Sequence, residues 1–228
     1  LLMQCNLVVL ALASARDAVH AVLASAEIAS EFAHARDYET GTHLDRMALY
    51  ARLIARHIAP RYGLSDEVIE HIYLFAPLHD VGKIAIPDSI LKKPGPLDEE
   101  EWAIMQTHVE QGVGLLERVI GKLCVESQPD SQVMLNIVAG HHEKLDGTGY
   151  PAGLAGDAVP VEARIITVAD IFDALVTRRP YKEPWSLEAA FEELERLVEL
   201  GQLDAHCVEA LRLQRKEVEA ILEAFPAD

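Results

Sequence analysis

Apolar residues recur at helical spacing along almost the whole chain, and strand-like alternation never extends beyond four residues. Residues 4–34 combine Ala, Val and Leu at spacings of three and four and contain neither Gly nor Pro. We therefore expect one long first helix there, which is a candidate interaction helix. A second helix is predicted over about 43–61, and Gly63 marks its end.

The N-terminus of a third helix is indicated at Ser65, whose hydroxyl can accept a hydrogen bond from a free backbone N–H of the first turn. Asp66 and Glu67 in that first turn favour the positive end of the helix dipole. The apolar periodicity continues beyond them, so we expect this helix to carry His79 and Asp80.

Proline and glycine interrupt the periodicity between residues 84 and 97, which we expect to form a loop. Asp98 and Glu101 have the spacing of an N-terminal capping box, which starts a further helix bearing His108. The face of this helix that we expect in the core carries Trp102, Met105 and Val109.

The C-terminal half predicts further helices and one exposed loop. Turn-forming residues dominate 146–153, which we expect to lie at the mouth of a site. Helices are predicted over about 131–143, 160–177, 186–200 and 204–224. The predicted fold class is all-α, a helical bundle.

Histidine and acidic residues occur at spacings that suit metal binding better than packing. They are Glu39 and His43, the adjacent pairs His79–Asp80 and His141–His142, His108, and Asp170. Residues four apart, such as Glu39 and His43, share one helix face, whereas adjacent residues diverge by roughly 100° and can contact two neighbouring ions. Imidazole and carboxylate without thiolate suit Fe, Mn, Ni or Zn, and argue against a purely structural zinc site.

Two of these clusters stand in motifs of a known family. The run His79-Asp80-Val81-Gly82-Lys83 resembles the signature of the HD hydrolase superfamily, and the run from His141 to Pro151 resembles the extended motif of its HD-GYP subfamily. Further blocks follow in family order at Asp37–His43, Ile86–Asp88, Lys93–Gly95, Asp170 with Asp173–Leu175, and Arg179–Lys182. The resemblance covers roughly residues 30–215.

The resemblance implies an HD-type helical bundle with a metal site in its core. It also implies a phosphodiesterase that hydrolyses cyclic di-GMP to linear pGpG and/or GMP. We divide the chain into an N-terminal lead-in over 1–34 and an HD-GYP catalytic domain over 35–228. Two alternatives stay open: a catalytically weak signalling module that binds cyclic di-GMP, and an HD hydrolase acting on other nucleotides.

The ligand set predicts a multinuclear site. Two or three divalent transition-metal ions, with Fe or Mn favoured over Ni or Zn, would be held by His79, Asp80, His108, His141, His142 and Asp170. These ions would bridge a water and lower its pKa towards about 7, giving a hydroxide nucleophile. We expect Asp80 to be the bridging carboxylate, and the resemblance adds Glu39 and His43 as ligands of a third ion. Lys83 is predicted to neutralise a phosphoryl oxygen; its alternative role is a salt bridge to a ligand carboxylate.

Substrate contacts rest mainly on the resemblance. It implies that Arg179 and Lys182 contact phosphate or guanine, and it adds Asp173 to the substrate-binding set. Tyr150 and Tyr181 are candidates for stacking on a base. The alternatives are that Tyr150 pins its loop, that Tyr181 lies in the core, and that Asp173 braces Arg179 or a ligand histidine.

Composition and charge narrow the partners. The 228 residues are 50% hydrophobic, enough for one substantial core, and the net charge of −17 argues against a nucleic-acid polymer or an anionic membrane as partner. A cyclic dinucleotide is itself anionic, so metal ions together with Lys83, Arg179 and Lys182 would have to supply local positive charge. Protein partners through the Gly149–Pro151 loop and a homodimer are left open.

The predicted location is the bacterial cytoplasm. Cys5, Cys124 and Cys207 are far apart and are expected to be reduced thiols. The longest apolar stretch, 7–13, is far below the ~20 residues of a membrane-spanning helix, so we expect no membrane insertion. Because the chain starts at Leu1, we expect a fragment or a processed chain. The HD-GYP resemblance leaves open a missing sensor or receiver domain.

Overall fold

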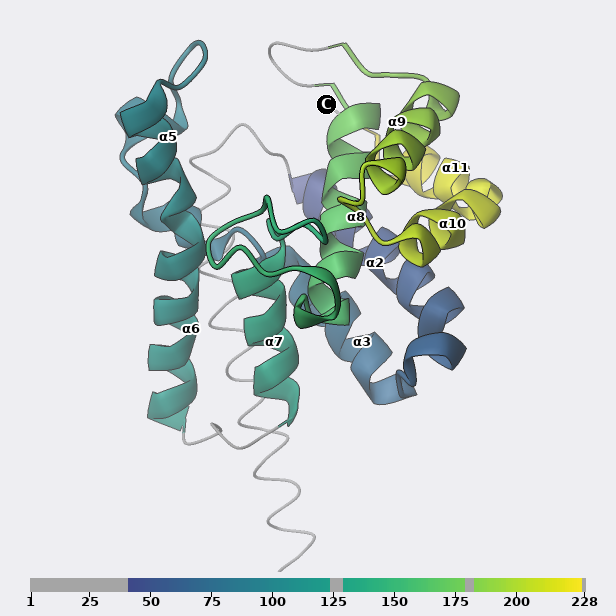
Figure 1. Ribbon diagram of the computed structural model, residues 1–228, viewed down its shortest axis with the longest axis horizontal. Helices are drawn as coiled ribbons and strands as arrows, with labels where there is room; N and C mark the ends of the chain where they lie inside the picture. Colours follow the sequence, from purple (N-terminus) through teal and green to yellow (C-terminus); the bar gives the residue numbers. More distant parts are fainter. Residues whose placement is uncertain (1–40, 124–128, 179–182, 227–228) are drawn as a thin grey trace, which may run out of the picture.

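Helix α2 (Gly41–Tyr62) lies in the middle of the bundle in this computed structural model, which describes residues 41–123, 129–178 and 183–226. It packs against α3 (Asp66–Phe75), α8 (Val161–Val176) and α10 (Ala205–Leu213) (Figure 1). Its side chains without exposed surface follow a spacing of three and four residues and are Met47, Tyr50, Ala51, Ile54 and Ala55. The helix predicted over 43–61 is thereby confirmed, and Gly63 ends it with a φ of 67°.

The remaining helices flank this centre on two sides (Figure 1). On one side α6 (His108–Leu123) packs against α7 (Pro129–Gly140), and α7 in turn contacts α3 and α8. Helix α5 (Glu99–Gln106) precedes α6 along the chain and extends the same side of the bundle. On the other side lie α9 (Leu187–Glu199), α10 and α11 (Arg215–Ala224). The helices enclose one large apolar core and a small separate one of Ile86, Ile90 and Leu91.

Local signals in the sequence set several helix boundaries as predicted. The Ser65 hydroxyl accepts from the backbone N–H of Val68, 3.2 Å away, at the start of α3. Asp98 and Glu101 form the expected capping box at the start of α5. Each cap satisfies backbone N–H groups that have no partner inside the helix, which fixes where the helix begins.

Two helices that were predicted to carry metal-ligand pairs end before those pairs. Helix α3 stops at Phe75 and gives way to the 3₁₀ helix η1 (Ala76–Leu78), because Pro77 has no N–H with which to continue the α-helical bonding. His79 and Asp80 therefore lie in a turn between η1 and a second 3₁₀ helix, η2 (Val81–Ala85). Helix α7 ends at Gly140, directly before the second pair of histidines.

Other predictions need smaller corrections. The predicted loop over 84–97 contains the short helix α4 (Asp88–Leu91), and the predicted helix over 204–224 breaks at Gln214 into α10 and α11. Trp102 was expected in the core but its side chain is 48% exposed, whereas Val109 of the same predicted face is buried. The predictions for 4–34, Glu39, Cys5, Cys124, Arg179, Tyr181 and Lys182 concern residues outside the described segments.

The all-α fold class is confirmed. Within the described segments the regular structure is helical. An isolated antiparallel β-bridge joins Asp146 and Ala155. The 3₁₀ helix η3 (Gly156–Ala158) then leads from this bridge towards α8. A search of the described helices finds none with the length and apolar character needed to span a membrane. The division at residues 34 and 35 stays a prediction.

Candidate metal centre

Three of the predicted ligand histidines are held by the same backbone contact. The Nδ1 atoms of His79, His108 and His141 lie 2.9, 2.8 and 3.0 Å from the carbonyl oxygens three residues earlier. Each of these residues follows the end of a helix, where the last carbonyls lack the N–H partner four residues later that a continuing α-helix would supply. Because a carbonyl only accepts, Nδ1 of each ring is the protonated donor and the Nε2 lone pair is turned towards the site.

The first ligand group combines these rings with a carboxylate. Ligand atoms of Asp80, His108, His141 and His142 all lie within 4.8 Å of one another. Asp80 Oδ1 is 3.2 Å from His108 Nε2 and 3.6 Å from His141 Nε2, and the two Nε2 atoms are 3.4 Å apart. Ligand atoms about 2.1 Å from one ion are separated by roughly 3–3.6 Å, so this spacing fits a shared cation. Facing Nε2 lone pairs repel each other unless a cation lies between them.

A second ligand group adjoins the first. It consists of His43 from α2, His79 from the turn after η1, and Asp170 from α8, again with ligand atoms within 4.8 Å of one another. Asp80 Oδ2 lies 3.1 Å from His79 Nε2, so the two oxygens of this one carboxylate face the two groups. That arrangement fits the bridging role predicted for Asp80. The two groups contain seven of the eight predicted ligands, and Glu39 lies outside the described segments.

Lys83 contacts the centre through the same carboxylate. Its Nζ lies 2.9 Å from Asp80 Oδ2, and its side chain is 14% exposed. Burial alone would raise the pKa of Asp80, but the Lys83 ammonium beside it holds this pKa well below its ordinary value. Burial also lowers the pKa of His141 and of His142, which favours the neutral imidazole that binds metals.

Asp173 does not fit the predicted substrate contact. Its side chain is fully buried, and its carboxylate accepts hydrogen bonds from Arg46 Nε and Nη2 at 2.7 and 2.9 Å. The same carboxylate accepts from His43 Nδ1 at 2.7 Å, which turns His43 Nε2 towards the second ligand group. The alternative in which Asp173 braces a ligand histidine describes this geometry. Asp173 is three residues beyond Asp170 on α8, so both reach the same side of the helix.

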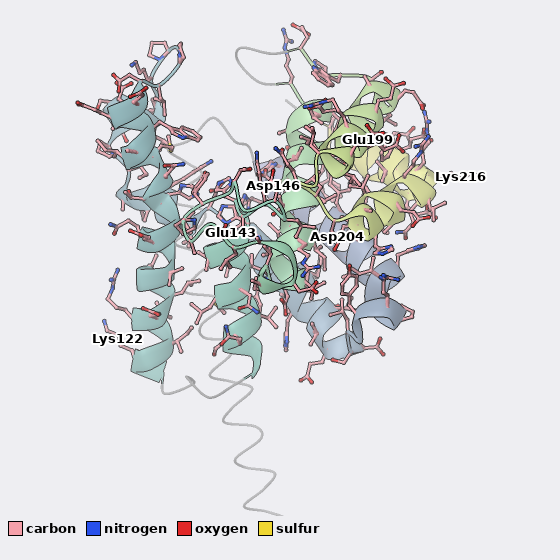
Figure 2. All side chains as sticks on the ribbon, viewed as in Figure 1. Lys122, Glu143, Asp146, Glu199, Asp204 and Lys216 are labelled. Atoms are coloured by element: carbon pink, nitrogen blue, oxygen red, sulfur yellow. The ribbon has the colours of Figure 1, made fainter. Side chains whose placement is uncertain are left out.

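The loop over 146–153 is held by a residue that sequence reasoning missed. The Glu143 carboxylate is buried and accepts from the backbone N–H groups of Ala152 and Leu154 at 2.8 and 2.9 Å. Figure 2 labels Glu143 together with Asp146 of this loop, which lies between α7 and α8. A Cβ added to Gly149 would lie 2.4 Å from the backbone nitrogen of Lys144, so the loop also folds closely onto the chain that follows the histidine pair.

Tyr150 lies over the first ligand group. Its ring stacks on His142 with centroids 4.6 Å apart and an interplanar angle of 27°. Burial is the main reason that the pKa of Tyr150 is raised, so the phenol is neutral at physiological pH. One face of the Tyr150 ring is occupied by His142. Both functions suggested for Tyr150, anchoring the loop and stacking on a base, would therefore depend on the other face and the edges of the ring. Tyr181, the other predicted stacking residue, lies outside the described segments.

Comparison with known families decides the classification. The family model described as HD domain matches residues 27–206, most of the chain. This chain belongs to the HD domain family. HD domains are metal-dependent hydrolases, and the two groups of histidine and aspartate found here supply a donor set that fits such metals.

Relatives of this HD domain support the predicted HD-GYP resemblance, which is confirmed. The 3'3'-cGAMP-specific phosphodiesterase 2 of Vibrio cholerae is 52% identical over 160 residues, covering 70% of this chain and 28% of the relative. The cyclic di-GMP phosphodiesterase response regulator RpfG of Xanthomonas campestris is 45% identical over 191 residues, covering 83% of this chain and 47% of the relative. The chain thus spans less than half the length of these two relatives.

The fold resembles that of a solved structure. Bd1817, a HDG"Y"P protein from Bdellovibrio bacteriovorus, matches with a TM-score of 0.57 at 17% sequence identity. The match covers 89% of this chain and 68% of that chain. At this identity the likeness concerns the helical architecture, and it agrees with the assignment of an HD domain.

Proposed function

We propose that this HD domain is a metal-dependent phosphodiesterase that hydrolyses cyclic di-GMP to linear pGpG and/or GMP. The observation that carries the proposal is the convergence of two ligand groups on the two oxygens of Asp80. Relatives named cyclic di-GMP phosphodiesterase support the substrate: RpfG, at 45% identity, and one from Thermotoga maritima that is 42% identical over 193 residues.

Each side chain has a defined task in this proposal. His108, His141 and His142 would hold one ion with Asp80 Oδ1, and His43, His79 and Asp170 would hold another beside Asp80 Oδ2, with Fe or Mn the favoured metals. When bound, such ions supply a more acidic water and offset negative charge on a phosphodiester. Glu39 would add a ligand for a third ion, whereas His43, which was predicted to serve that ion with it, lies in the second ligand group.

Lys83 places a positive charge next to Asp80. Its ammonium, 2.9 Å from the carboxylate, would offset charge that develops on a phosphoryl oxygen as the P–O bond is cleaved. Arg179 and Lys182 would contact phosphate or guanine. These roles are inferred from the HD-GYP resemblance, because the three residues stand at positions that match the family's motifs.

A second candidate substrate is favoured by one specific comparison. The relative that is 52% identical over 160 residues is named as specific for 3'3'-cGAMP. A cyclic GMP-AMP differs from cyclic di-GMP in one base and shares the phosphodiester ring. Hydrolysis of this hybrid would use the same metal centre and would change only the contacts to the second base.

The test combines metal analysis with product chromatography. Protein purified without chelator should contain two or more transition-metal ions per chain and should convert cyclic di-GMP, 3'3'-cGAMP or both to linear products. Asp80→Ala should lose metal and activity together, since this carboxylate serves both groups. One ion or fewer per chain would rule out the multinuclear centre, and metal-replete protein that cleaves neither nucleotide would rule out the proposed activity.

Further domains, cellular location, oligomeric state and protein partners are also proposals. A sensor or receiver domain outside this sequence is supported by RpfG, which is named a response regulator and is about twice as long as the matched segment. A cytoplasmic location, a homodimer and protein partners of the Gly149–Pro151 loop stay predictions.

A further inference from the structure

An exposed indole stands beside the metal centre. The Trp102 side chain is 48% exposed, although tryptophan is usually well buried. Its ring lies 6.2 Å from the ring of Tyr150, with an interplanar angle of 78°. Tyr150 in turn stacks on His142, a member of the first ligand group. The three rings therefore lead in sequence from the metal centre to solvent.

Helix α5 holds Trp102 in this place without burying it. The capping box at Asp98 and Glu101 fixes the start of the helix, and Met105 packs against the small core of residues 86–91. None of the side chains of α5 is fully buried, so the helix projects beyond the bundle. Trp102 lies three residues before Met105 on the same face, where the small core has ended and Tyr150 is the aromatic neighbour.

Tyr150 is poorly placed to be the main stacking surface. One face of its ring lies on His142, and Trp102 approaches it edge to face. The indole of Trp102, in contrast, retains about half of its surface for a ligand. Aromatic rings stack on nucleobases of any kind because every base has a π-face.

We propose that Trp102 stacks on a purine base of the bound cyclic dinucleotide while a phosphate of that nucleotide lies at the metal centre. The inference rests on the proposed function and adds a base-binding residue to it. In a nucleotide, base and phosphate are separated by the ribose, as the indole is separated from the ligand group by the Tyr150 ring. Trp102 is thus a binding residue remote from the bond that breaks.

Steady-state kinetics with metal-loaded protein test the role. Trp102→Ala should raise KM for cyclic di-GMP by roughly 5- to 150-fold, the range that corresponds to losing one base–aromatic stack. It should leave kcat nearly unchanged, because the contact is the same in the ground and transition states. Trp102→Phe should retain most of the affinity. Ile104→Ala is the matched control, since Ile104 is a 42% exposed apolar residue of the same helix.

Fluorescence gives a readout that is independent of turnover. The chain contains two tryptophans, so Trp185→Phe leaves Trp102 as the reporter and Trp102→Phe leaves Trp185. Titration with cyclic di-GMP should quench emission in the Trp185→Phe protein and change it little in the Trp102→Phe protein. Quenching confined to the protein that retains Trp185 would overturn the inference.

The outcomes separate the inference from the proposed activity. If wild-type protein cleaves the nucleotide while Trp102→Ala matches Ile104→Ala in KM, the activity stands and the stacking role is wrong. If wild-type protein cleaves nothing but the Trp102 reporter is still quenched, the stacking site stands without the activity. Absence of both cleavage and quenching contradicts both. Circular dichroism of Trp102→Ala should match wild type, because the side chain contributes little to the core.

Discussion

Asp173 and Arg46 form a buried ion pair whose removal has a calculable cost. Asp173 is fully buried and Arg46 is 2% exposed, and the guanidinium also donates to the backbone carbonyl of Phe225 at 2.9 Å. In Asp173→Ala, Arg46 would lose two charge-assisted hydrogen bonds and keep its charge in the interior. Removing one partner of a buried pair costs about 3–5 kcal/mol, and we expect a loss of this size in the free energy of unfolding.

The same substitution should weaken the second ligand group. Asp173 accepts the hydrogen bond from His43 Nδ1 that orients the ring, and loss of such an outer contact lowers metal affinity by about 10- to 100-fold. Among the described residues, the Asp173 carboxylate accepts hydrogen bonds from His43 and Arg46, and neither belongs to the first ligand group. Metal titration of Asp173→Ala should therefore show one weakened site and one site close to wild type.

The assay is urea unfolding followed by circular dichroism, with chelator present so that metal binding does not add to stability. The matched control is the double variant Arg46→Met with Asp173→Leu, which removes both charges and fills the space with apolar atoms. Replacing a whole buried pair in this way is often neutral, so the double variant should be more stable than Asp173→Ala. A loss below about 1 kcal/mol in Asp173→Ala, or a double variant that is less stable than the single one, would refute the argument.

Three further substitutions test other parts of the site. Gly82→Ala should lower the melting temperature and deplete metal, because the new Cβ would lie 1.8 Å from the carbonyl oxygen of His108; elemental analysis and calorimetry check this. Glu143→Gln should speed amide exchange at Ala152 and Leu154, measured by mass spectrometry, since a neutral amide replaces the carboxylate that holds both N–H groups. Asp204→Asn should be less stable than wild type at pH 7, and this difference should shrink below about pH 4 in urea titrations. Burial would raise the pKa of Asp204, but Tyr62 and Arg164 hold it below its ordinary value, so its contribution is lost as acid protonates it.

The residues that gather at the candidate centre could be predicted from the sequence, but their local structure could not. Residue type and motif pointed to pairs such as His79–Asp80, whose side chains lie in the two adjoining groups, although their predicted places in helices were wrong. Pro77 and Gly140 are ordinary signals for the end of a helix, and both were overlooked beside strong apolar periodicity. Their importance lies in the carbonyls near the histidines, which they leave without the backbone partner four residues later that an α-helix provides.

Trp102 shows a different limit of periodicity. Spacing identifies one face of a helix, and Met105 and Val109 on that face do pack inward. It does not say where the neighbouring elements end, and Trp102 on the same face is 48% exposed. Arg46 and Glu143 were missed because their partners are decided by the tertiary fold: Asp173 is 127 residues from Arg46, and Leu154 is 11 residues from Glu143. The one local signal for Arg46 was its position three residues after His43 on the same helix.

Three histidines of the centre are oriented in the same way, by a backbone carbonyl at the end of the preceding helix. This explains why the residues just before each histidine matter. His79, His108 and His141 each follow a helix end and donate from Nδ1 to a carbonyl three residues earlier. A histidine inside a helix would find that carbonyl already bonded along the helix axis, and its ring would be free to choose another rotamer. Ending the helix just before the ligand therefore supplies both the tautomer and the direction of Nε2. Insertion of one helical residue before His141 would separate the ring from its carbonyl, even though every ligand of the motif would still be present.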